Sequence, residues 1–245
     1  YIDSTMRSLE LPITKQENYL SAVLPSIDSI KYWTITDSNF FLRSYGYLKA
    51  IKLQSAGKIP PDSFFEIIIN NLAEENKMHQ SGIKSSLKGR NIRDQQMAEN
   101  LKWIQLHKYP NEKIIVWAAN AHIANYIYND PKKNETKIAA MGHYVKSDST
   151  LSAKTYILGF TSHEGMAGRL GYPKYKIRKP QKNGFENWIN PSFKYAFTDF
   201  KQYNKSKSTD YFYLKALGHQ TAFKKDWNNI FDGVLFIRDM YSCQE

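Results

Sequence analysis

The chain has 245 residues, of which 42% are hydrophobic and 14% aromatic, and this composition excludes a disordered protein. Its length allows one large domain or two small ones, and its single cysteine, Cys243, excludes an intrachain disulfide. The net charge of +11 makes nucleic acid a candidate partner. No apolar run approaches the roughly 18–20 residues of a membrane span, so none is expected.

The first 110 residues have the periodicity and the end signals of α-helices. Asp37-Ser38 is a candidate N-cap for a helix that ends near Gly57, and Pro60-Pro61-Asp62 begins another helix. A further helix is expected at about 91–108, where apolar residues recur every three or four positions.

The rest of the chain contains short apolar runs typical of β-strands. Lys113–Ala119 is nearly unbroken and indicates a central strand buried on both faces. A short helix is expected at about 120–128, stopped by Asn129-Asp130-Pro131. Further strands are expected at Lys154–Phe160 and Gly233–Ile237.

The segment Lys174–Lys207 is strongly basic and rich in aromatic residues. It carries nine Lys and Arg residues against two acidic ones. Bases interleaved with aromatics are typical of surfaces that bind single-stranded nucleic acid. No RNA-binding signature or helix-turn-helix pattern accompanies the segment, so a lysine-rich solvated face over an aromatic core is the preferred interpretation. Nucleic acid is not the expected partner.

Asn120 and His122 follow the apolar run at the opening of the expected helix. The positive end of the helix dipole disfavours imidazolium there, so the ring is expected to be neutral and able to accept a proton or polarise a carbonyl. From position alone, a histidine satisfied by a backbone carbonyl is an equally good interpretation. Arg93 and Asp94 are expected at a helix start, where a structural ion pair is the favoured interpretation.

The other motifs argue against several kinds of site. His143 and His163 lie in expected loops without metal-ligand spacing, and no HExxH, CxxC or carboxylate cluster occurs, so no metal or other cofactor is expected. The absence of a GxSxG elbow argues against an α/β-hydrolase, and there is no P-loop or GxGxxG motif. The remaining histidines are expected at the surface: His79, His107 and His219.

Several motifs taken together resemble the erythromycin esterase family. They are Arg93-Asp94-x-x-Met97-Ala98-x-Asn100-x-x-Trp103, then Lys113-Ile-Ile-Val-Trp117-Ala-Ala-Asn120-Ala-His122, Met141-Gly142, Tyr156-x-x-Gly159-Phe160, Glu164-Gly165 and Phe231-Asp232-x-Val234-x-Phe236-Ile237. They occur in the family's order over roughly residues 85–240, and the first motif is the most specific.

The resemblance implies an α/β fold with a mixed β-sheet flanked by many helices and a helix-rich N-terminal part. Residues 1–84 would be a helical segment of that fold or a subdomain, and residues 85–245 its α/β region. The implied activity is metal-independent hydrolysis of a small-molecule ester, in the best-known members the lactone of macrolide antibiotics, which would confer antibiotic resistance. The implied site residues are His122 and Arg93 as catalytic groups and Asn100, Trp117, Asn120 and His143 as substrate contacts.

Two departures from the family pattern limit this expectation. Ala119 stands where many members have a histidine, and nothing in residues 1–84 resembles the Gly-Glu-x-x-His segment whose histidine activates water. The chain therefore resembles the C-terminal part of a family member. It is expected to need the N-terminal portion of the same protein, to be inactive alone, and to form a homodimer through exposed apolar surface. The alternatives are a non-catalytic ligand-binding domain of the same fold and a basic nucleic-acid-binding protein.

Overall fold

The computed structural model describes residues 1–27, 35, 37–80, 87–128, 137–168, 170–206 and 210–242. The chain forms two compact units, Tyr1–Ile114 and Ile115–Glu245, each with a buried core of its own. The domain boundary expected between residues 84 and 85 stays a prediction. Cys243 and the expected stop signal Asn129-Asp130-Pro131 lie outside the described residues.

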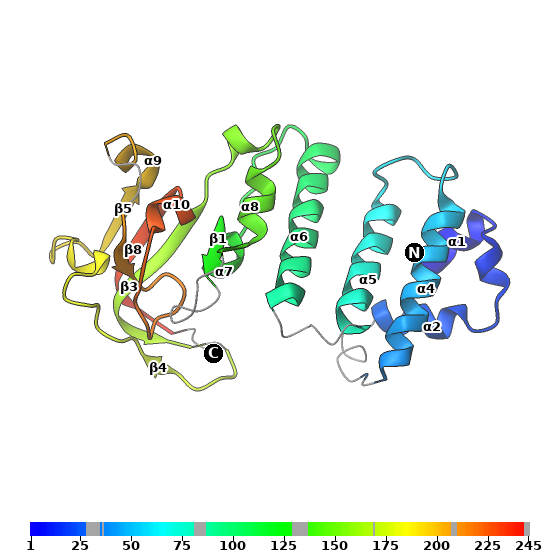
Figure 1. Ribbon diagram of the computed structural model, residues 1–245, viewed down its shortest axis with the longest axis horizontal. Helices are drawn as coiled ribbons and strands as arrows, with labels where there is room; N and C mark the ends of the chain where they lie inside the picture. Colours follow the sequence, from blue (N-terminus) through cyan, green and yellow to red (C-terminus); the bar gives the residue numbers. More distant parts are fainter. Residues whose placement is uncertain are drawn as a thin grey trace. The chain divides into compact units, whose positions relative to one another are not determined.

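The first unit is built from helices (Figure 1). In chain order they are α1 (Ile2–Ser8), the 3₁₀ turn η1 (Pro12–Lys15), α2 (Tyr19–Ile27), α4 (Ser38–Ser55), α5 (Phe64–Gln80), α6 (Leu87–Trp103) and the π-helical turn η2 (Ile104–Lys108). The Asp37 carboxylate accepts a hydrogen bond from the Asn39 N–H at 2.9 Å, which confirms the predicted N-cap of α4. The helix expected at 91–108 corresponds to α6 and η2 and begins one turn earlier, so Arg93 and Asp94 lie inside it rather than at its start.

Packing of α4 against α5 makes the core of this unit. Leu48 and Ile51 of α4 are buried together with Phe65 and Ile69 of α5, at the spacings of three and four residues that an amphipathic helix requires. Each such side chain stabilises the fold by about 1.5–3 kcal/mol. The α4–α5 pair is therefore a stable support for α6, which packs on α5.

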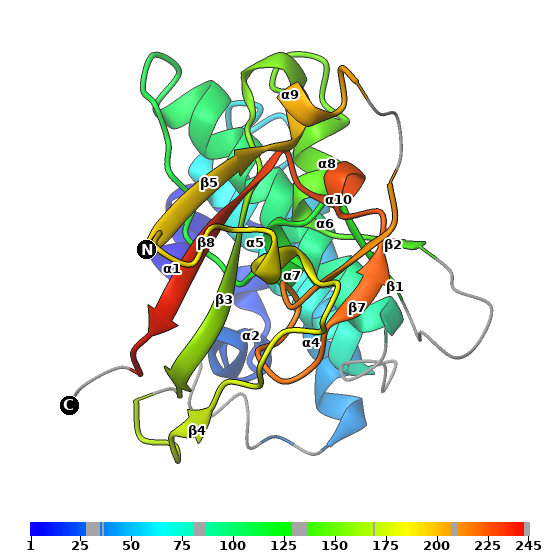
Figure 2. The same cartoon turned by 90° about the vertical axis from the view of Figure 1, so that its left-hand side faces the viewer.

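The second unit contains a four-stranded mixed sheet (Figure 2). Its strands are β3 (Leu158–Ala167), β4 (Tyr175–Lys176), β5 (Tyr195–Asp199) and β8 (Gly233–Met240), in the spatial order β4-β3-β8-β5. β3 and β8 are parallel, with Leu158 beside Gly233, whereas β5 and β4 are antiparallel to their neighbours. The mixed sheet and its flanking helices confirm the predicted fold class.

Smaller elements complete the second unit. Two short antiparallel ladders pair β1 (Tyr126–Tyr128) with β2 (Lys137–Ala139) and β6 (Phe212–Leu214) with β7 (Phe223–Lys225). The helical pieces are α7 (Asn120–Ile123), α8 (Met141–Lys146), η3 (Ser152–Lys154), η4 (Phe185–Asn187), α9 (Phe200–Tyr203) and α10 (Trp227–Ile230).

Aromatic side chains fill the core on one face of the mixed sheet. The rings of Trp227 and Phe231 are parallel within 2°, with centroids 6.2 Å apart. The Phe231 ring lies on Gly159 of β3, where a Cβ would come within 2.9 Å of it, so this strand position requires glycine. Phe185 and Phe200, from the basic aromatic segment, belong to the same core.

Most aromatic residues of Lys174–Lys207 are nevertheless exposed, so the aromatic-core interpretation of that segment holds only for its buried members. The exposed ones are Tyr175, Trp188, Phe193, Tyr195 and Phe197. In the edge strand β5 the core-facing positions are Ala196 and Thr198, which lie beside the buried β8 residues. Strand alternation therefore directs Tyr195 and Phe197 to the opposite face.

The run Lys113–Ala119 is not a buried central strand, and that prediction is wrong. The run has no regular secondary structure, and Ile115 and Trp117 are 92% and 82% exposed. A strand is held by ladder hydrogen bonds, and no described strand pairs with this run. Its sequence has the apolar character of a strand, but burial depends on neighbours that a local pattern does not specify.

The remaining expectations for this unit hold in part. The helix expected at 120–128 is only the four-residue α7, because Tyr126–Tyr128 pairs with β2 as a strand. The strand expected at Lys154–Phe160 begins at Leu158 and continues to Ala167. The strand expected at Gly233–Ile237 is confirmed as β8.

Candidate active site

The Asn120 side chain fixes the position of α7. Its Nδ2 donates to the carbonyl oxygens of Phe160 and Ala216, both at 2.6 Å, and its Oδ1 accepts from the Phe160 N–H at 3.0 Å. The amide thus bonds to the backbone of β3 as a neighbouring strand would. Both amide hydrogens are used inside the protein, which leaves no donor for a substrate.

His122 lies in α7, two residues after this anchor. Its backbone N–H donates to the Ala119 carbonyl at 2.8 Å, which closes the first turn of the helix, and the residue is partly buried. Trp117 lies just before α7, with its ring centroid 5.1 Å from that of Phe160. His122 is therefore carried on a helix that is bonded directly to the central sheet.

Helix α8, which carries His143, packs directly against α7. A Cβ at Gly142 would lie 2.0 Å from the Ile123 carbonyl oxygen and 2.7 Å from that of Ala124. Only glycine allows the two backbones to come this close. The structure therefore brings His122 and His143 onto two helices in direct contact.

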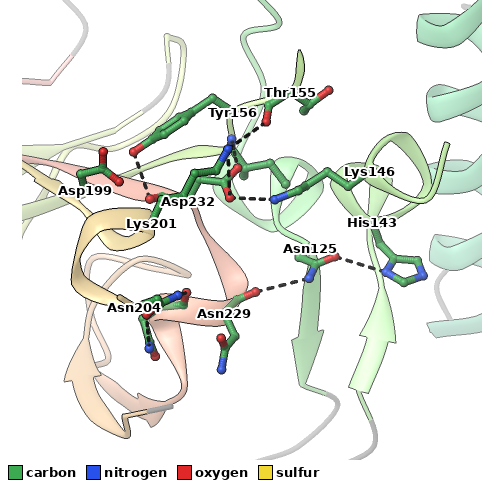
Figure 3. Close-up of polar contacts among 12 residues, drawn as sticks. Asn125, His143, Lys146, Thr155, Tyr156, Asp199, Lys201, Asn204, Asn229 and Asp232 are labelled. Atoms are coloured by element: carbon green, nitrogen blue, oxygen red, sulfur yellow. Dashed lines mark hydrogen bonds and ion pairs between the residues drawn. The ribbon is translucent and has the colours of Figure 1, made fainter. Parts of the chain in front are cut away.

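Asn125 orients the His143 ring and favours one tautomer of it (Figure 3). Its Nδ2 donates to the Asn229 carbonyl at 3.3 Å, so its Oδ1 is the atom that faces His143 Nδ1, 3.2 Å away. An amide oxygen only accepts, and Nδ1 must therefore carry the proton. In the neutral ring, the Nε2 of this exposed histidine is then a proton acceptor.

Asp232 connects α8 to the sheet through its carboxylate (Figure 3). Its Oδ1 accepts from Lys146 Nζ at 2.7 Å, and its Oδ2 accepts from the buried Ile157 N–H at 2.7 Å. Lys201 Nζ lies 3.9 Å from the same Oδ1. A nearly buried carboxylate with charge-assisted bonds on both oxygens holds its partners firmly.

Tyr156 lies beside this carboxylate and donates its hydroxyl to the Asp232 carbonyl at 3.0 Å. Burial, together with the negative charges of Asp199 and Asp232, raises the pKa of Tyr156 to about 12. The phenol is therefore neutral at physiological pH and acts as a donor rather than as a base.

In the first unit, Asn100 and Arg93 lie on α6. Asn100 exchanges two hydrogen bonds with Asn71 of α5, at 2.7 and 2.8 Å, and accepts a third from Gln96, so its amide joins the two helices. Arg93 lines a cleft of about 230 Å³ between the same helices. The lining residues are Asn71, Glu74, Glu75, Met78, Ile92, Arg93, Gln96 and Met97.

A buried polar cluster along β3 was not predicted from the sequence. Glu186 is fully buried and accepts from the Thr161 hydroxyl at 2.6 Å and from the Lys215 N–H at 2.8 Å. Lys215 is 2% exposed, and its Nζ donates to the carbonyls of His163 and Arg178. Burial lowers the pKa of Lys215. No local sequence signal marks these partners, which come together only in the folded chain.

Two of the three histidines expected at the surface are enclosed. The His79 side chain is 8% exposed, and its ring stacks on Phe41 with centroids 4.7 Å apart. His219 Nδ1 lies 3.2 Å from the hydroxyl of the buried Ser162. Burial, with a contribution from Lys215, lowers the pKa of His219.

The described part of the chain contains no group of three or more His, Cys, Asp or Glu residues arranged to hold a metal ion. Among the helices of the described ranges, none combines the length and the apolar character needed to cross a membrane.

Comparison with known families decides the affiliation of the chain. Residues 42–240 match the family profile described as erythromycin esterase, which covers well over half of the sequence. The chain belongs to the erythromycin esterase family. This agrees with the resemblance in the sequence motifs, and no curated protein matches the chain.

Solved structures share this erythromycin esterase-like fold. A protein from Bacillus cereus is 15% identical and has a TM-score of 0.65, over 98% of this chain and 62% of its own. A succinoglycan biosynthesis protein is 17% identical with a TM-score of 0.64, over 98% and 60% of the two chains. A mutant of erythromycin esterase EreC in its open conformation is 13% identical with a TM-score of 0.66, over 96% and 63%. The present chain thus spans about three fifths of the length of these relatives.

The predicted site residues of this family member fall into two groups. Trp117, Asn120, His122 and His143 belong to the second unit, on α7, α8 and the segment before them. Arg93 and Asn100 belong to α6 of the first unit.

Proposed function

We propose that the chain is the part of an erythromycin esterase-type hydrolase that carries the second catalytic histidine of the family. The proposed substrate is a small-molecule ester, with a macrolide lactone as the leading candidate. The observation that carries the proposal is the placement of His122 and His143 on two helices in direct contact, one bonded to β3 and the other to Asp232. Membership of the family supplies the reaction class.

Ester hydrolysis needs a base for water, a positive group for the carbonyl oxygen and a proton for the leaving alcohol. The water oxygen bonds to the carbonyl carbon while the C=O electron pair moves onto oxygen. The bond to the alcohol then breaks as a proton reaches the leaving oxygen. In the family pattern another histidine takes the proton from water. His122 is proposed as the second histidine, whose neutral imidazole can exchange a proton with the leaving alcohol, and no step requires a metal.

The other predicted residues take supporting roles in this proposal. Arg93, on α6 of the first unit, stays a predicted catalytic residue of the family pattern, and no step is assigned to it here. Trp117 offers an exposed ring to the apolar part of a macrolide, and His143 offers Nε2 as a hydrogen-bond acceptor. Asn100 and Asn120 act by positioning their helices, because their amides are engaged within the protein.

The test is hydrolysis of erythromycin and of p-nitrophenyl acetate by the protein as its gene encodes it. We expect His122→Gln to lower kcat/KM by about 10²–10⁴-fold, the range for loss of a general acid–base group. The exposed His107, replaced by glutamine, is the matched control and should leave kcat/KM unchanged. Equal activity in His122→Gln would remove His122 from the mechanism.

A second measurement separates the proposal from the binding-domain alternative. Calorimetric titration with erythromycin reports binding whether or not hydrolysis follows. Binding by a parent protein that hydrolyses neither substrate would support a non-catalytic binding domain of the same fold.

A further inference from the structure

Asn125 is held by its backbone and by its side chain, so its side-chain oxygen has a fixed direction. Its N–H donates to the Ile230 carbonyl at 3.0 Å, and its carbonyl accepts from the Ala140 N–H at 3.5 Å. The side-chain Nδ2 donates to the Asn229 carbonyl at 3.3 Å, which leaves Oδ1 facing His143 Nδ1 (Figure 3). This oxygen is a fixed acceptor, and it favours the tautomer with the proton on Nδ1.

The backbone of His143 is fixed as well. Its N–H donates to the Ala140 carbonyl at 3.0 Å, and its carbonyl accepts from both the N–H and the hydroxyl of Ser147 at 2.8 Å. The Tyr144 ring lies edge-on to the imidazole, with centroids 5.6 Å apart. The imidazole therefore has a supported orientation in which Nε2 is the nitrogen left for a ligand.

A second amide–imidazole pair in the same unit has the opposite arrangement. Asn187 Nδ2 donates to the Gln181 carbonyl at 2.8 Å, so its Oδ1 faces His163 Nε2, 3.2 Å away. In the neutral His163 ring the proton is therefore favoured on Nε2. The His163 side chain is 18% exposed, whereas His143 is exposed. The acceptor nitrogen of His143 is thus available to a ligand.

We propose that Asn125 is a positioning residue that makes the site selective for esters carrying a hydroxyl group. An acceptor at His143 Nε2 can bond a ligand O–H, whereas a methyl ether has no proton to donate and a carboxylate brings only further acceptors. The substrate class is therefore a neutral hydroxylated ester. This inference rests on the proposed function for the ester bond itself. Asn125 acts through His143 and touches no substrate.

The first measurement is NMR of the ring nitrogens at about pH 9, where an ordinary imidazole is neutral. We expect the proton on Nδ1 in His143 and on Nε2 in His163. Asn125→Leu, which has no acceptor, should release the preference of the His143 ring, whereas Asn125→Asp keeps an oxygen there and should retain it. Asn187→Leu is the matched control, and it should alter the His163 ring alone.

The second measurement is kcat/KM for p-nitrophenyl 3-hydroxybutyrate and for its methyl ether, p-nitrophenyl 3-methoxybutyrate. The parent protein should prefer the hydroxy ester by about 2–10-fold, the range for one net hydrogen bond. Asn125→Leu should bring the ratio of the two kcat/KM values towards one. Asn125→Asp and Asn187→Leu should keep the preference of the parent protein.

Two results would overturn the proposal. The first is a proton on Nε2 of His143 in the parent protein. The second is an equal preference for the hydroxy ester in the parent protein and in Asn125→Leu. Hydrolysis of neither ester would overturn the proposed function and the substrate class with it, while the NMR measurement would still decide the role of Asn125.

Discussion

Replacing Asn120 by alanine tests the central structural argument about α7. The substitution removes the hydrogen bonds of 2.6, 2.6 and 3.0 Å to Phe160 and Ala216 and leaves one N–H and two carbonyls without these partners. At a net 0.5–1.5 kcal/mol each, three bonds amount to about 1.5–4.5 kcal/mol of unfolding free energy. For a unit of this size, that lowers Tm by about 10 °C. Asn120→Asp should be at least as destabilising at neutral pH, because a carboxylate would face two carbonyl oxygens.

The assay for Asn120→Ala combines calorimetric unfolding with hydrogen exchange at the Phe160 amide. Loss of the Oδ1 acceptor should speed exchange of this particular N–H, which a general loosening of the first unit would not do. Asn190→Ala is the matched control, because the exposed Asn190 side chain bonds only within its own turn, to Ser192. If Asn120→Ala melts with the parent protein and keeps Phe160 protected, the anchoring role of this amide is refuted.

Three further predictions concern the second unit. Asp232→Ala should lower the unfolding free energy by about 2–3 kcal/mol, because it removes the acceptor of the buried Ile157 N–H and the partner of Lys146. Asp232→Asn should lower it by less. Urea unfolding measures both variants, and equal losses would argue against a role for the Asp232 charge. His219 has a folded-state pKa below its unfolded value, so the unfolded chain binds the proton more tightly and stability falls as pH drops below about 6.5. The difference in unfolding free energy between about pH 7.5 and about pH 5.5 should be smaller in His219→Gln than in the parent protein. An equal difference in the two proteins would contradict this prediction. Trp227→Ala should cost about 3–5 kcal/mol in calorimetry, because it empties a fully buried site in the core.

The elements that the sequence predicted correctly have local signals. Asp37 caps α4 through the N–H of a residue two positions on, and the apolar run at Gly233–Ile237 forms β8 as expected. The errors arise where distant neighbours decide the outcome. Lys113–Ala119 has the composition of a buried strand but meets no described partner strand.

The contacts around the candidate site could be predicted from the sequence only in part. The sequence predicts His122 as a site residue from its place after an apolar run and from the family motifs, and this stays a prediction. The partners that hold the site in place were not predictable, because Asn120 bonds to Phe160 across 40 residues and Asp232 to Lys146 across 86. Spacing along the chain carries no information about such pairs.

The close contact at Gly142 couples the positions of α7 and α8. The backbones touch where a Cβ would lie 2.0 Å from the Ile123 carbonyl oxygen, so neither helix can shift toward the other. A shift of α8 toward the sheet would therefore push on α7 and strain the hydrogen bonds of Asn120. The backbone positions of the two histidines, His122 and His143, are therefore coupled.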